Sequence, residues 1–124
     1  MDTKLLLIED DITLRDLYQA RFGLENFEIA VATDGEMGLE KAGIVMPDVI
    51  LLDLRIPKLS GFEVLRQLKQ NDKTKHIPVI ILTALSGDED RDQVMKLGAS
   101  AFLTKSETVP KQVLEEIMKV LPKK

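Results

Sequence analysis

The chain has 124 residues, of which 44% are hydrophobic, and a formal net charge of −4 at pH 7. This size is typical of one domain with enough apolar residues for a buried core, and we expect residues 1–124 to form a single domain. The chain contains no cysteine, which excludes disulfide bonds, thiolate metal sites and a cysteine nucleophile. The acidic balance argues against nucleic-acid binding by this domain, and the low content of aromatic residues argues against a base-stacking surface.

The N-terminal segment and the hydropathy of the chain predict its location. The first residues do not resemble a signal peptide, because Asp2 and Lys4 flank an apolar run that is too short. No apolar stretch approaches the ~20 residues that are needed to span a bilayer. No repeat, low-complexity segment or linker rich in proline, glycine and serine divides the sequence. We therefore expect a cytoplasmic protein that makes no membrane contact.

Five short apolar runs alternate with helix-like stretches, which is typical of buried parallel strands joined by helices. The strands are expected at residues 4–8, 27–32, 49–53, 79–83 and 101–104. Helical periodicity between and after them predicts helices at about 12–24, 35–45, 61–70, 88–97 and 108–121. Asp34 is expected to cap the second helix, Pro110 to lie in the first turn of the fifth, and Pro122 to end it.

Apolar residues at helical spacing predict the face of each helix that packs on the sheet. The expected inward residues are Leu14, Leu17, Tyr18 and Leu24 of the first helix, Phe62, Leu65 and Leu68 of the third, and Val109, Val113, Ile117 and Leu121 of the fifth. Asp11 precedes the first helix and is expected to act as its N-cap or as an acid of its first turn.

This alternation predicts an α/β fold of the (βα)5 flavodoxin-like, doubly wound kind, with helices on both faces of a five-stranded parallel sheet. The expected strand order is 2-1-3-4-5, in which the first and third strands lie side by side. In such sheets the carboxyl ends of the strands form the ligand crevice. Residues at the ends of four strands are therefore expected to converge at one edge.

Polar residues mark those four strand ends. Glu9 and Asp10 follow the first strand, Asp53 and Thr83 end the third and fourth, and Lys105 follows the fifth. Carboxylates ~4 Å apart repel by about 4 kcal/mol per pair at an effective dielectric constant of 20. Such a cluster therefore indicates a protonated acid or a bound cation. Oxygen ligands without histidine or cysteine favour Mg²⁺, with Mn²⁺ as the alternative ion.

The other groups expected at this edge indicate phosphoryl chemistry. An aspartate can attack phosphorus to give an acyl phosphate. A lysine adds a positive charge that attracts phosphate, and a threonine hydroxyl can donate a hydrogen bond to a phosphate oxygen. Together with a cation, these groups would stabilise the charge on a phosphoryl group during its transfer. Taken singly, each residue also has a plain structural interpretation, as a loop cap, a strand residue or a surface lysine.

Four stretches of the sequence carry a family resemblance: LLLIEDD (5–11), PDVILLDLRIPKLSGFEVL (47–65), IPVIILTA (77–84) and GASAFLTK (98–105). In this order and spacing they resemble the receiver domain of two-component response regulators, and they span nearly the whole chain. The resemblance implies one receiver domain without an output domain, either as a stand-alone protein or as a piece of a larger regulator. It also implies a phosphoacceptor switch rather than an enzyme that turns over an external substrate.

The resemblance implies roles for the residues of the crevice. Asp53 accepts a phosphoryl group from a histidine kinase or a histidine phosphotransfer protein. Asp10 and Asp53 bind Mg²⁺ directly, Glu9 acts through water, and the backbone carbonyl of Arg55 supplies another ligand.

The resemblance also implies a conformational switch. Thr83 and Lys105 contact the phosphoryl oxygens, and Phe102 occupies the position of the family's rotating aromatic residue. Phosphorylation would draw Thr83 inward, let Phe102 swing in and reshape the face formed by the fourth helix, fifth strand and fifth helix. The expected partners are the kinase or phosphotransfer protein and a downstream protein target. The expected state is a monomer or a weak phosphorylation-dependent dimer.

The sequence departs from the family pattern at several positions. Ser106 replaces the proline that follows the lysine in most receivers, which can change the setting of this loop. Arg55 and Leu85 occupy positions that tune dephosphorylation in the family, and we expect them to shield the phosphate and to slow its hydrolysis. Ser100 replaces an aspartate of many DNA-binding regulators that dimerise through the switch face, which weakens the case for that dimer.

The residues also bear on three other functions. A degenerate receiver would bind partners without phosphorylation, and Ser106 leaves that alternative open. A phosphatase of the haloacid dehalogenase type also uses a strand-end aspartate with Mg²⁺, but its second aspartate would fall at Arg55. A flavodoxin-like cofactor module would need a glycine-rich phosphate loop after the first strand, where this chain has acids.

Overall fold

The computed structural model describes residues 3–121. Its elements are β1 (Thr3–Ile8), α1 (Ile12–Gly23), β2 (Phe27–Ala32), α2 (Gly35–Val45), β3 (Val49–Leu52), α3 (Gly61–Gln70), β4 (Val79–Thr83), α4 (Asp88–Lys96), β5 (Ala101–Thr104), the 3₁₀-helix η1 (Lys105–Glu107) and α5 (Pro110–Val120). All ten predicted strands and helices are present. Their bounds differ from the predicted ones by two residues at most, at the start of α5.

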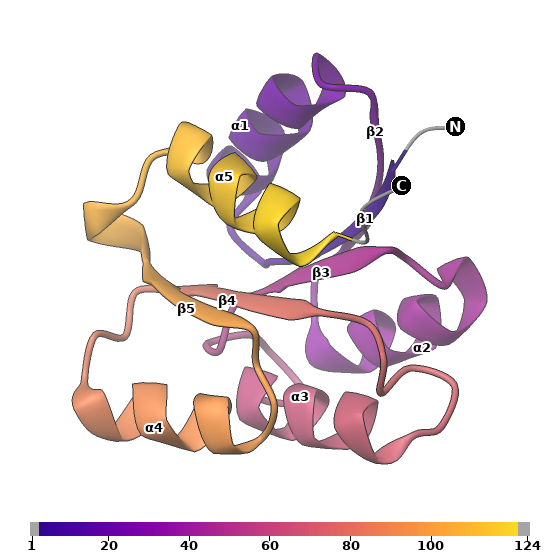
Figure 1. Cartoon of the computed structure of the whole chain (residues 1–124), viewed down its shortest axis with the longest axis vertical. Coiled ribbons are helices and arrows are strands. Elements are labelled where there is room, and N and C mark those ends of the chain that lie inside the picture. Colours follow the sequence, from indigo (N-terminus) through magenta and orange to yellow (C-terminus); the bar gives the residue numbers. More distant parts are fainter. Residues whose placement is uncertain (1–2, 122–124) are drawn as a thin grey trace.

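The five strands form one parallel sheet in the predicted order β2-β1-β3-β4-β5. Figure 1 shows α1 and α5 over one face of this sheet, and α2, α3 and α4 over the other. The order makes β1 and β3 neighbours at the point where the winding of the chain reverses. Their carboxyl ends therefore meet at one edge of the sheet.

Each face of the sheet has its own apolar core, because side chains alternate along a strand. On β1, Leu5 and Leu7 pack with residues of α1 and α5, whereas Leu6 and Ile8 pack with residues of α2, α3 and α4. All four side chains are buried. Burial on both faces explains why the strands are continuous apolar runs rather than alternating ones.

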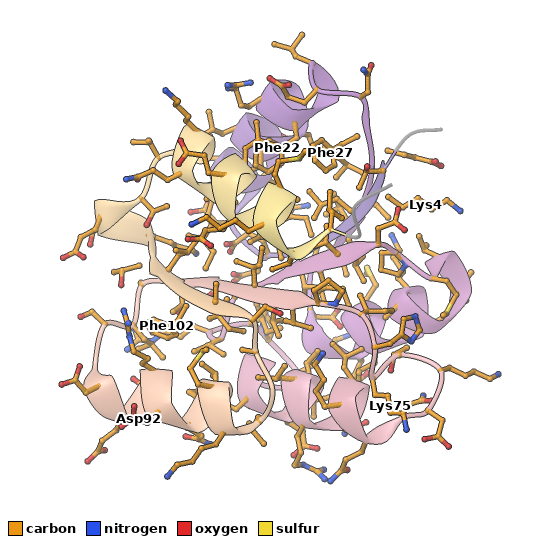
Figure 2. All side chains as sticks on the ribbon, viewed as in Figure 1. Lys4, Phe22, Phe27, Lys75, Asp92 and Phe102 are labelled. Carbon is orange, nitrogen blue, oxygen red and sulfur yellow. The ribbon has the colours of Figure 1, made fainter. Side chains whose placement is uncertain are left out.

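The aromatic side chains divide between the two cores. On the α1 side, the ring of Phe22 lies 5.2 Å from that of Tyr18 and 5.7 Å from that of Phe27. Figure 2 shows Phe22 and Phe27 near α1 and Phe102 on the opposite side of the sheet, toward α4. Each tilted ring pair adds about 0.5–1.5 kcal/mol beyond the burial of its area.

Side-chain caps explain where the helices begin. The Asp11 carboxylate accepts a hydrogen bond from the Thr13 N–H (2.9 Å), and the Asp34 carboxylate accepts one from the Met37 N–H (2.8 Å). Each bond satisfies a donor that has no partner within its helix. Pro110 is the first residue of α5, where its missing N–H costs nothing.

The predicted inner faces of two helices are wrong in part. In α1, Leu17 and Leu24 are 49% and 80% exposed, and the buried residues are Tyr18 and Phe22. Adjacent helical residues point about 100° apart, so Tyr18 and Leu17 cannot both face the core, and Leu24 lies beyond the last turn. In α5, Val109 is exposed because it precedes the first turn as the N-cap residue.

The segment after β5 also differs from the prediction. The sequence predicts a loop there, but Lys105–Glu107 form one turn of 3₁₀-helix, and α5 therefore starts later. Pro122, predicted to end α5, lies outside the described residues. Over residues 3–121 no helix is both long and apolar enough to cross a membrane.

Candidate functional site

Backbone pairing brings two of the predicted acids together. Ile8 of β1 pairs with Leu52 of β3, and the next residues, Glu9 and Asp53, extend the hydrogen bonding beyond the strands. The Asp53 N–H donates to the Ile8 carbonyl (3.1 Å), and the Glu9 N–H donates to the Ala32 carbonyl (3.0 Å). Both side chains are thereby fixed at the carboxyl edge of the sheet, as predicted.

Lys105 reaches these two acids from β5. It is the residue after Thr104, the last of that strand. Its Nζ lies 2.8 Å from Glu9 Oε1 and 2.9 Å from Asp53 Oδ2. The carboxylates are almost fully buried, with 2% and 5% of their side-chain surface exposed, against 23% for Lys105. The single positive charge of Lys105 thus offsets part of the negative charge of two buried carboxylates. Without such a partner, burial of either charged carboxylate would be strongly unfavourable.

Backbone N–H groups hold the remaining oxygen of each acid. Glu9 Oε2 accepts a hydrogen bond from the Asp11 N–H, and Asp53 Oδ1 accepts one from the Arg55 N–H, both at 3.2 Å. Each buried carboxylate therefore has one lysine partner and one backbone partner. These contacts fix the orientation of both carboxylates.

Asp10 completes an acidic cluster. One carboxylate oxygen from each of Glu9, Asp10 and Asp53 lies within 4.8 Å of the other two. Glu9 and Asp53 are buried, and Asp10 is exposed. The cluster offers hard oxygen ligands and contains neither histidine nor cysteine, so it fits Mg²⁺ or Mn²⁺. One exposed and two buried acids also suit an ion that keeps several of its waters.

The electrostatics of the cluster favour a further cation. Burial raises the pKa of Glu9 to about 7; the hydrogen bond from Lys105 opposes this rise, and the charge of Asp53 adds to it. Burial also acts to lower the pKa of Lys105, but its hydrogen bonds to Glu9 and Asp53 outweigh burial and raise that pKa. Either protonation of Glu9 or a bound cation would therefore relieve the repulsion among these acids.

Tyr18 of α1 is a neighbour of this cluster that the sequence predicts only as a core residue. Burial raises its pKa to about 12, while the charge of Lys105 lowers that pKa and the charge of Glu9 raises it. The acid–lysine cluster, which we define as Glu9, Asp53 and Lys105, lies toward the α1 side of the sheet, because Glu9 and Asp53 follow Ile8 and Leu52, whose side chains point to the other face. No sequence signal identifies this neighbourhood, because it depends on how α1 packs.

Thr83 and Phe102 lie on the opposite face of the sheet. Thr83 is fully buried and follows Ile81 by two residues, so its side chain points to the core shared with α3 and α4. Its Oγ1 accepts a hydrogen bond from the Leu85 N–H (3.3 Å). Phe102 pairs in register with Ile81 and is 8% exposed within the same core. Between residues 3 and 121, no hydrogen bond joins Thr83 to the acid–lysine cluster.

A cation covers the ring of Phe102. The Arg91 guanidinium of α4 lies 5.3 Å from the ring centroid. Arg91 belongs to the charged run 88–92 at the start of α4. Its contact with Phe102 escapes sequence reasoning because the two residues lie on different elements. The family resemblance also implies an inward swing of Phe102 on phosphorylation, and in this structure the ring is already buried.

Three positions that depart from the family pattern lie within two residues of a predicted site residue and leave the site intact. Ser106 is exposed in η1, and Lys105 still reaches both acids beside it. Arg55 is exposed, and Leu85 is half-buried against the core. The change at Ser106 is therefore compatible with the predicted position of the lysine.

The sequence matches the family model described as the response regulator receiver domain over residues 5–118. This range is most of the chain, and the fold and the acidic cluster agree with it. The chain therefore belongs to the response regulator receiver domain family of two-component signalling systems, as its motifs indicate.

Two relatives illustrate the similarity. Response regulator PleD of Caulobacter vibrioides is 42% identical over 105 residues, which are 85% of this chain and 23% of that protein. The alkaline phosphatase synthesis transcriptional regulatory protein PhoP of Bacillus subtilis is 33% identical over 121 residues, which are 98% of this chain and 49% of that protein. The match thus spans about a quarter of the length of the first relative and about half of the second.

Solved structures have the same fold. Chemotaxis protein CheY4 of Vibrio cholerae has a TM-score of 0.90 and 27% identity, covering 98% of this chain and 100% of that chain. The beryllofluoride-activated receiver domain of RstA from Klebsiella pneumoniae has a TM-score of 0.89 and 26% identity, with the same coverage. The receiver domain of sensor histidine kinase PA1611 from Pseudomonas aeruginosa, solved with a magnesium ion in its active-site cleft, has a TM-score of 0.86, covering 96% of this chain and 97% of that chain. At 23% identity, that last likeness concerns the fold alone.

Proposed function

We propose that this chain is a phosphoacceptor signalling switch, in which Asp53 takes a phosphoryl group from a histidine kinase or a histidine phosphotransfer protein. The observation that carries the proposal is the pairing of buried Asp53 with Lys105 beside two further acids at the sheet edge. A carboxylate held by one lysine and one backbone N–H is presented to an incoming phosphorus atom in a fixed orientation.

Mg²⁺ is the cofactor that we propose for this site, with Mn²⁺ as the alternative. Asp10 and Asp53 would hold the ion directly, Glu9 through water, and the Arg55 backbone carbonyl would supply a further oxygen. When bound, the ion neutralises carboxylate charge and polarises the phosphoryl oxygens. The oxygen-only donor set of the acidic cluster supports this choice.

The transfer forms one bond and breaks one. A carboxylate oxygen of Asp53 attacks the phosphorus of a phosphohistidine, the new O–P bond forms and the P–N bond breaks. The electron pair of the broken bond returns to the imidazole nitrogen, which takes up a proton. Lys105 Nζ, now 2.9 Å from Asp53 Oδ2, would then donate to a phosphoryl oxygen and stabilise its charge.

Thr83 would carry the signal to the other face of the sheet. Its hydroxyl oxygen accepts a hydrogen bond from Leu85, so its own proton can be donated to a phosphoryl oxygen. Movement of Thr83 toward that oxygen would change the packing next to Phe102 on the neighbouring strand. Because Phe102 is already buried, we propose a repacking of the ring within the core rather than its entry from solvent. The α4–β5–α5 face would thereby change its affinity for a downstream protein target.

Hydrolysis of the aspartyl phosphate would be slow, and no external substrate would be turned over. A hydrolase of the haloacid dehalogenase type would place a second aspartate, as its acid and base, at the position of Arg55. The exposed Arg55 and the half-buried Leu85 would instead restrict the approach of water to the phosphate. We further propose a cytoplasmic location, no direct nucleic-acid or membrane binding, and a monomer or weak phosphorylation-dependent dimer.

The test is the intact mass of the chain after incubation with acetyl phosphate, with and without Mg²⁺. The proposal expects the addition of one phosphoryl group that requires both Mg²⁺ and Asp53, so that Asp53→Asn and EDTA each abolish it. Modification that persists in Asp53→Asn would contradict the assignment of the acceptor. No addition from acetyl phosphate or from phosphorylated kinase would favour a degenerate receiver that binds its partners without phosphorylation.

A further inference from the structure

The loop that follows Asp53 is packed at both ends. We define the acceptor loop as residues 53–61, between β3 and α3. At its far end, the Gly61 N–H donates to the Leu54 carbonyl (3.0 Å). A Cβ at Gly61 would overlap the Asp53 carbonyl oxygen and stand 2.5 Å from Leu54 Cα. The end of the loop therefore packs directly against the backbone of the acceptor residue. Only glycine permits so close an approach at position 61.

The middle of the acceptor loop rests on the start of α2. The Pro57 carbonyl accepts hydrogen bonds from the Leu59 N–H (2.8 Å) and from the Gly35 N–H of α2 (3.2 Å). The bond from Leu59 closes a tight turn around Lys58, whose φ of 69° lies in the left-handed region. Such a conformation is costly for a lysine and persists only where the surroundings impose it.

Asp34, the N-cap of α2, and Gly35, its first residue, provide those surroundings. A Cβ at Gly35 would overlap the Leu59 carbonyl oxygen and stand 2.7 Å from Leu59 Cβ. Asp34 Oδ2 lies 3.7 Å from Lys58 Nζ, while Oδ1 of the same carboxylate caps α2 through Met37. We define Asp34 and Gly35 as the α2 dock. The dock contacts the acceptor loop by a backbone hydrogen bond, by close packing and by charge.

We propose that the α2 dock is a positioning element of the phosphoryl site, in that it sets the acceptor-loop backbone between Asp53 and Gly61. This inference rests on the proposed function, because the backbone in question carries the Arg55 carbonyl that would bind Mg²⁺. Mg²⁺ requires nearly octahedral geometry, so a displaced carbonyl oxygen lowers its affinity. Within residues 3–121, no hydrogen bond or ion pair joins the dock to the acids, so we expect the dock to act through the loop.

The chain offers two matched pairs of variants. Gly35→Ala adds a methyl group against Leu59, whereas Gly43→Ala adds the same group to the same helix with no atom within 4 Å. Asp34→Asn keeps a capping side chain but removes the charge that faces Lys58. Glu36→Gln removes an equal charge from an exposed residue of the same helical turn.

The experiment is an NMR titration of each variant with MgCl₂, which follows the amide signals of the folded form in residues 53–61. Any unfolded fraction then lowers the signal intensity but not the fitted Kd. We expect Gly35→Ala to bind Mg²⁺ about tenfold more weakly than wild type, the effect seen when groups that support a metal ligand are removed. Gly43→Ala should bind like wild type. Asp34→Asn should bind Mg²⁺ between about 1.5-fold and fivefold more weakly than Glu36→Gln, the range for an ion pair with an exposed lysine.

The outcomes separate this inference from the function on which it rests. Equal Mg²⁺ affinities of Gly35→Ala and Gly43→Ala would overturn the dock and leave the proposed function standing. If Gly35→Ala does not fold, the Asp34→Asn and Glu36→Gln pair decides, and equal affinities there would overturn the dock. A wild-type chain that binds no Mg²⁺ would overturn the proposed function and the dock together.

Discussion

The two faces of the sheet hold their functional residues by contacts of different strength. Near α1, Lys105 joins Glu9 and Asp53 through charged contacts of 2.8 and 2.9 Å. Toward α4, Thr83 and Phe102 are packed among apolar side chains. Their polar contacts there are a hydrogen bond of 3.3 Å from Leu85 to Thr83 and a guanidinium 5.3 Å from the ring of Phe102.

This difference suits a switch. Short charged contacts fix the place where a phosphoryl group would bind, because moving one charge leaves another buried without a partner. Contacts of about 1 kcal/mol, such as a neutral hydrogen bond or an exposed cation–π pair, allow a second arrangement at small cost. We call the acid–lysine cluster the rigid side and the surroundings of Thr83 and Phe102 the adaptable side. A ligand bound on the rigid side can then shift the population of conformations on the adaptable side.

Removal of Lys105 from the rigid side should have the largest effect on phosphoryl transfer. In Lys105→Ala, the rate of phosphoryl uptake by Asp53 should fall about 10²–10³-fold, the loss expected for a preorganised group that stabilises transition-state charge. Time courses of intact mass with acetyl phosphate measure this rate. Lys111→Ala removes an exposed lysine of α5 and serves as the control. Equal rates for the two variants would show that Lys105 has no part in the transfer.

The pH dependence of stability should reveal the buried charge of Glu9. The folded chain raises the pKa of Glu9 from 4.5 to about 7, so between these values the folded state binds more protons than the unfolded state. Stability from this group is complete below pH 4.5 and is lost as the pH rises to 7, by at most roughly 3 kcal/mol.

Urea unfolding in EDTA, from pH 4.5 to 7.5, measures this loss. The free energy of unfolding of wild type should fall relative to that of Glu9→Gln, which cannot titrate at this position. Parallel curves for the two proteins would mean that Glu9 has an ordinary pKa in the folded state. Addition of Mg²⁺ at pH 7.5 should restore stability to wild type, because a bound cation neutralises the ionised acid.

A variant of Arg55 tests whether this side chain restricts the approach of water to the aspartyl phosphate. Arg55→Asn replaces a long side chain by a short polar one, and should speed hydrolysis of the aspartyl phosphate by about tenfold, which corresponds to 1.4 kcal/mol in the barrier. Loss of the phosphorylated mass after removal of acetyl phosphate gives the rate. An unchanged decay rate would rule out shielding by this residue.

The smallest effect is expected on the adaptable side. Arg91→Ala removes the cation from the ring of Phe102, and should lower the free energy of unfolding by about 0.5–1 kcal/mol. Lys96→Ala, at an exposed position in the last turn of the same helix, controls for the loss of a positive charge. Urea midpoints that do not differ between the two variants would show that the contact with Phe102 contributes nothing measurable.

Strand order and the gathering of the site residues could be predicted because both follow from local signals. Apolar runs define the strands, and residues that end parallel strands must meet at one edge. Asp53 and Glu9 are adjacent for this reason alone. The contact of Lys105 with both acids could not be predicted, because it depends on one side-chain conformation among several of similar energy.

Packing of helices on the sheet was less accessible from the sequence. A rotation of α1 by about 100° exchanges Leu17 for Tyr18 at the core, and both residues satisfy the same apolar pattern. The contact of Arg91 with Phe102 joins α4 to β5, and no spacing of residues in the sequence indicates it. The packing of the acceptor loop on Gly35 depends likewise on the relative position of two segments far apart in the chain.

The most direct test of coupling between the two faces uses beryllofluoride, an analogue of the phosphoryl group, with Mg²⁺. Amide chemical shifts of wild type should change at residues 53–55 and also along α4 and β5. In Thr83→Val, which keeps the shape of the buried side chain but lacks its hydroxyl, the shifts at 53–55 should persist and those along α4 and β5 should largely disappear. Shifts along α4 and β5 that are as large in Thr83→Val as in wild type would contradict transmission through this hydroxyl.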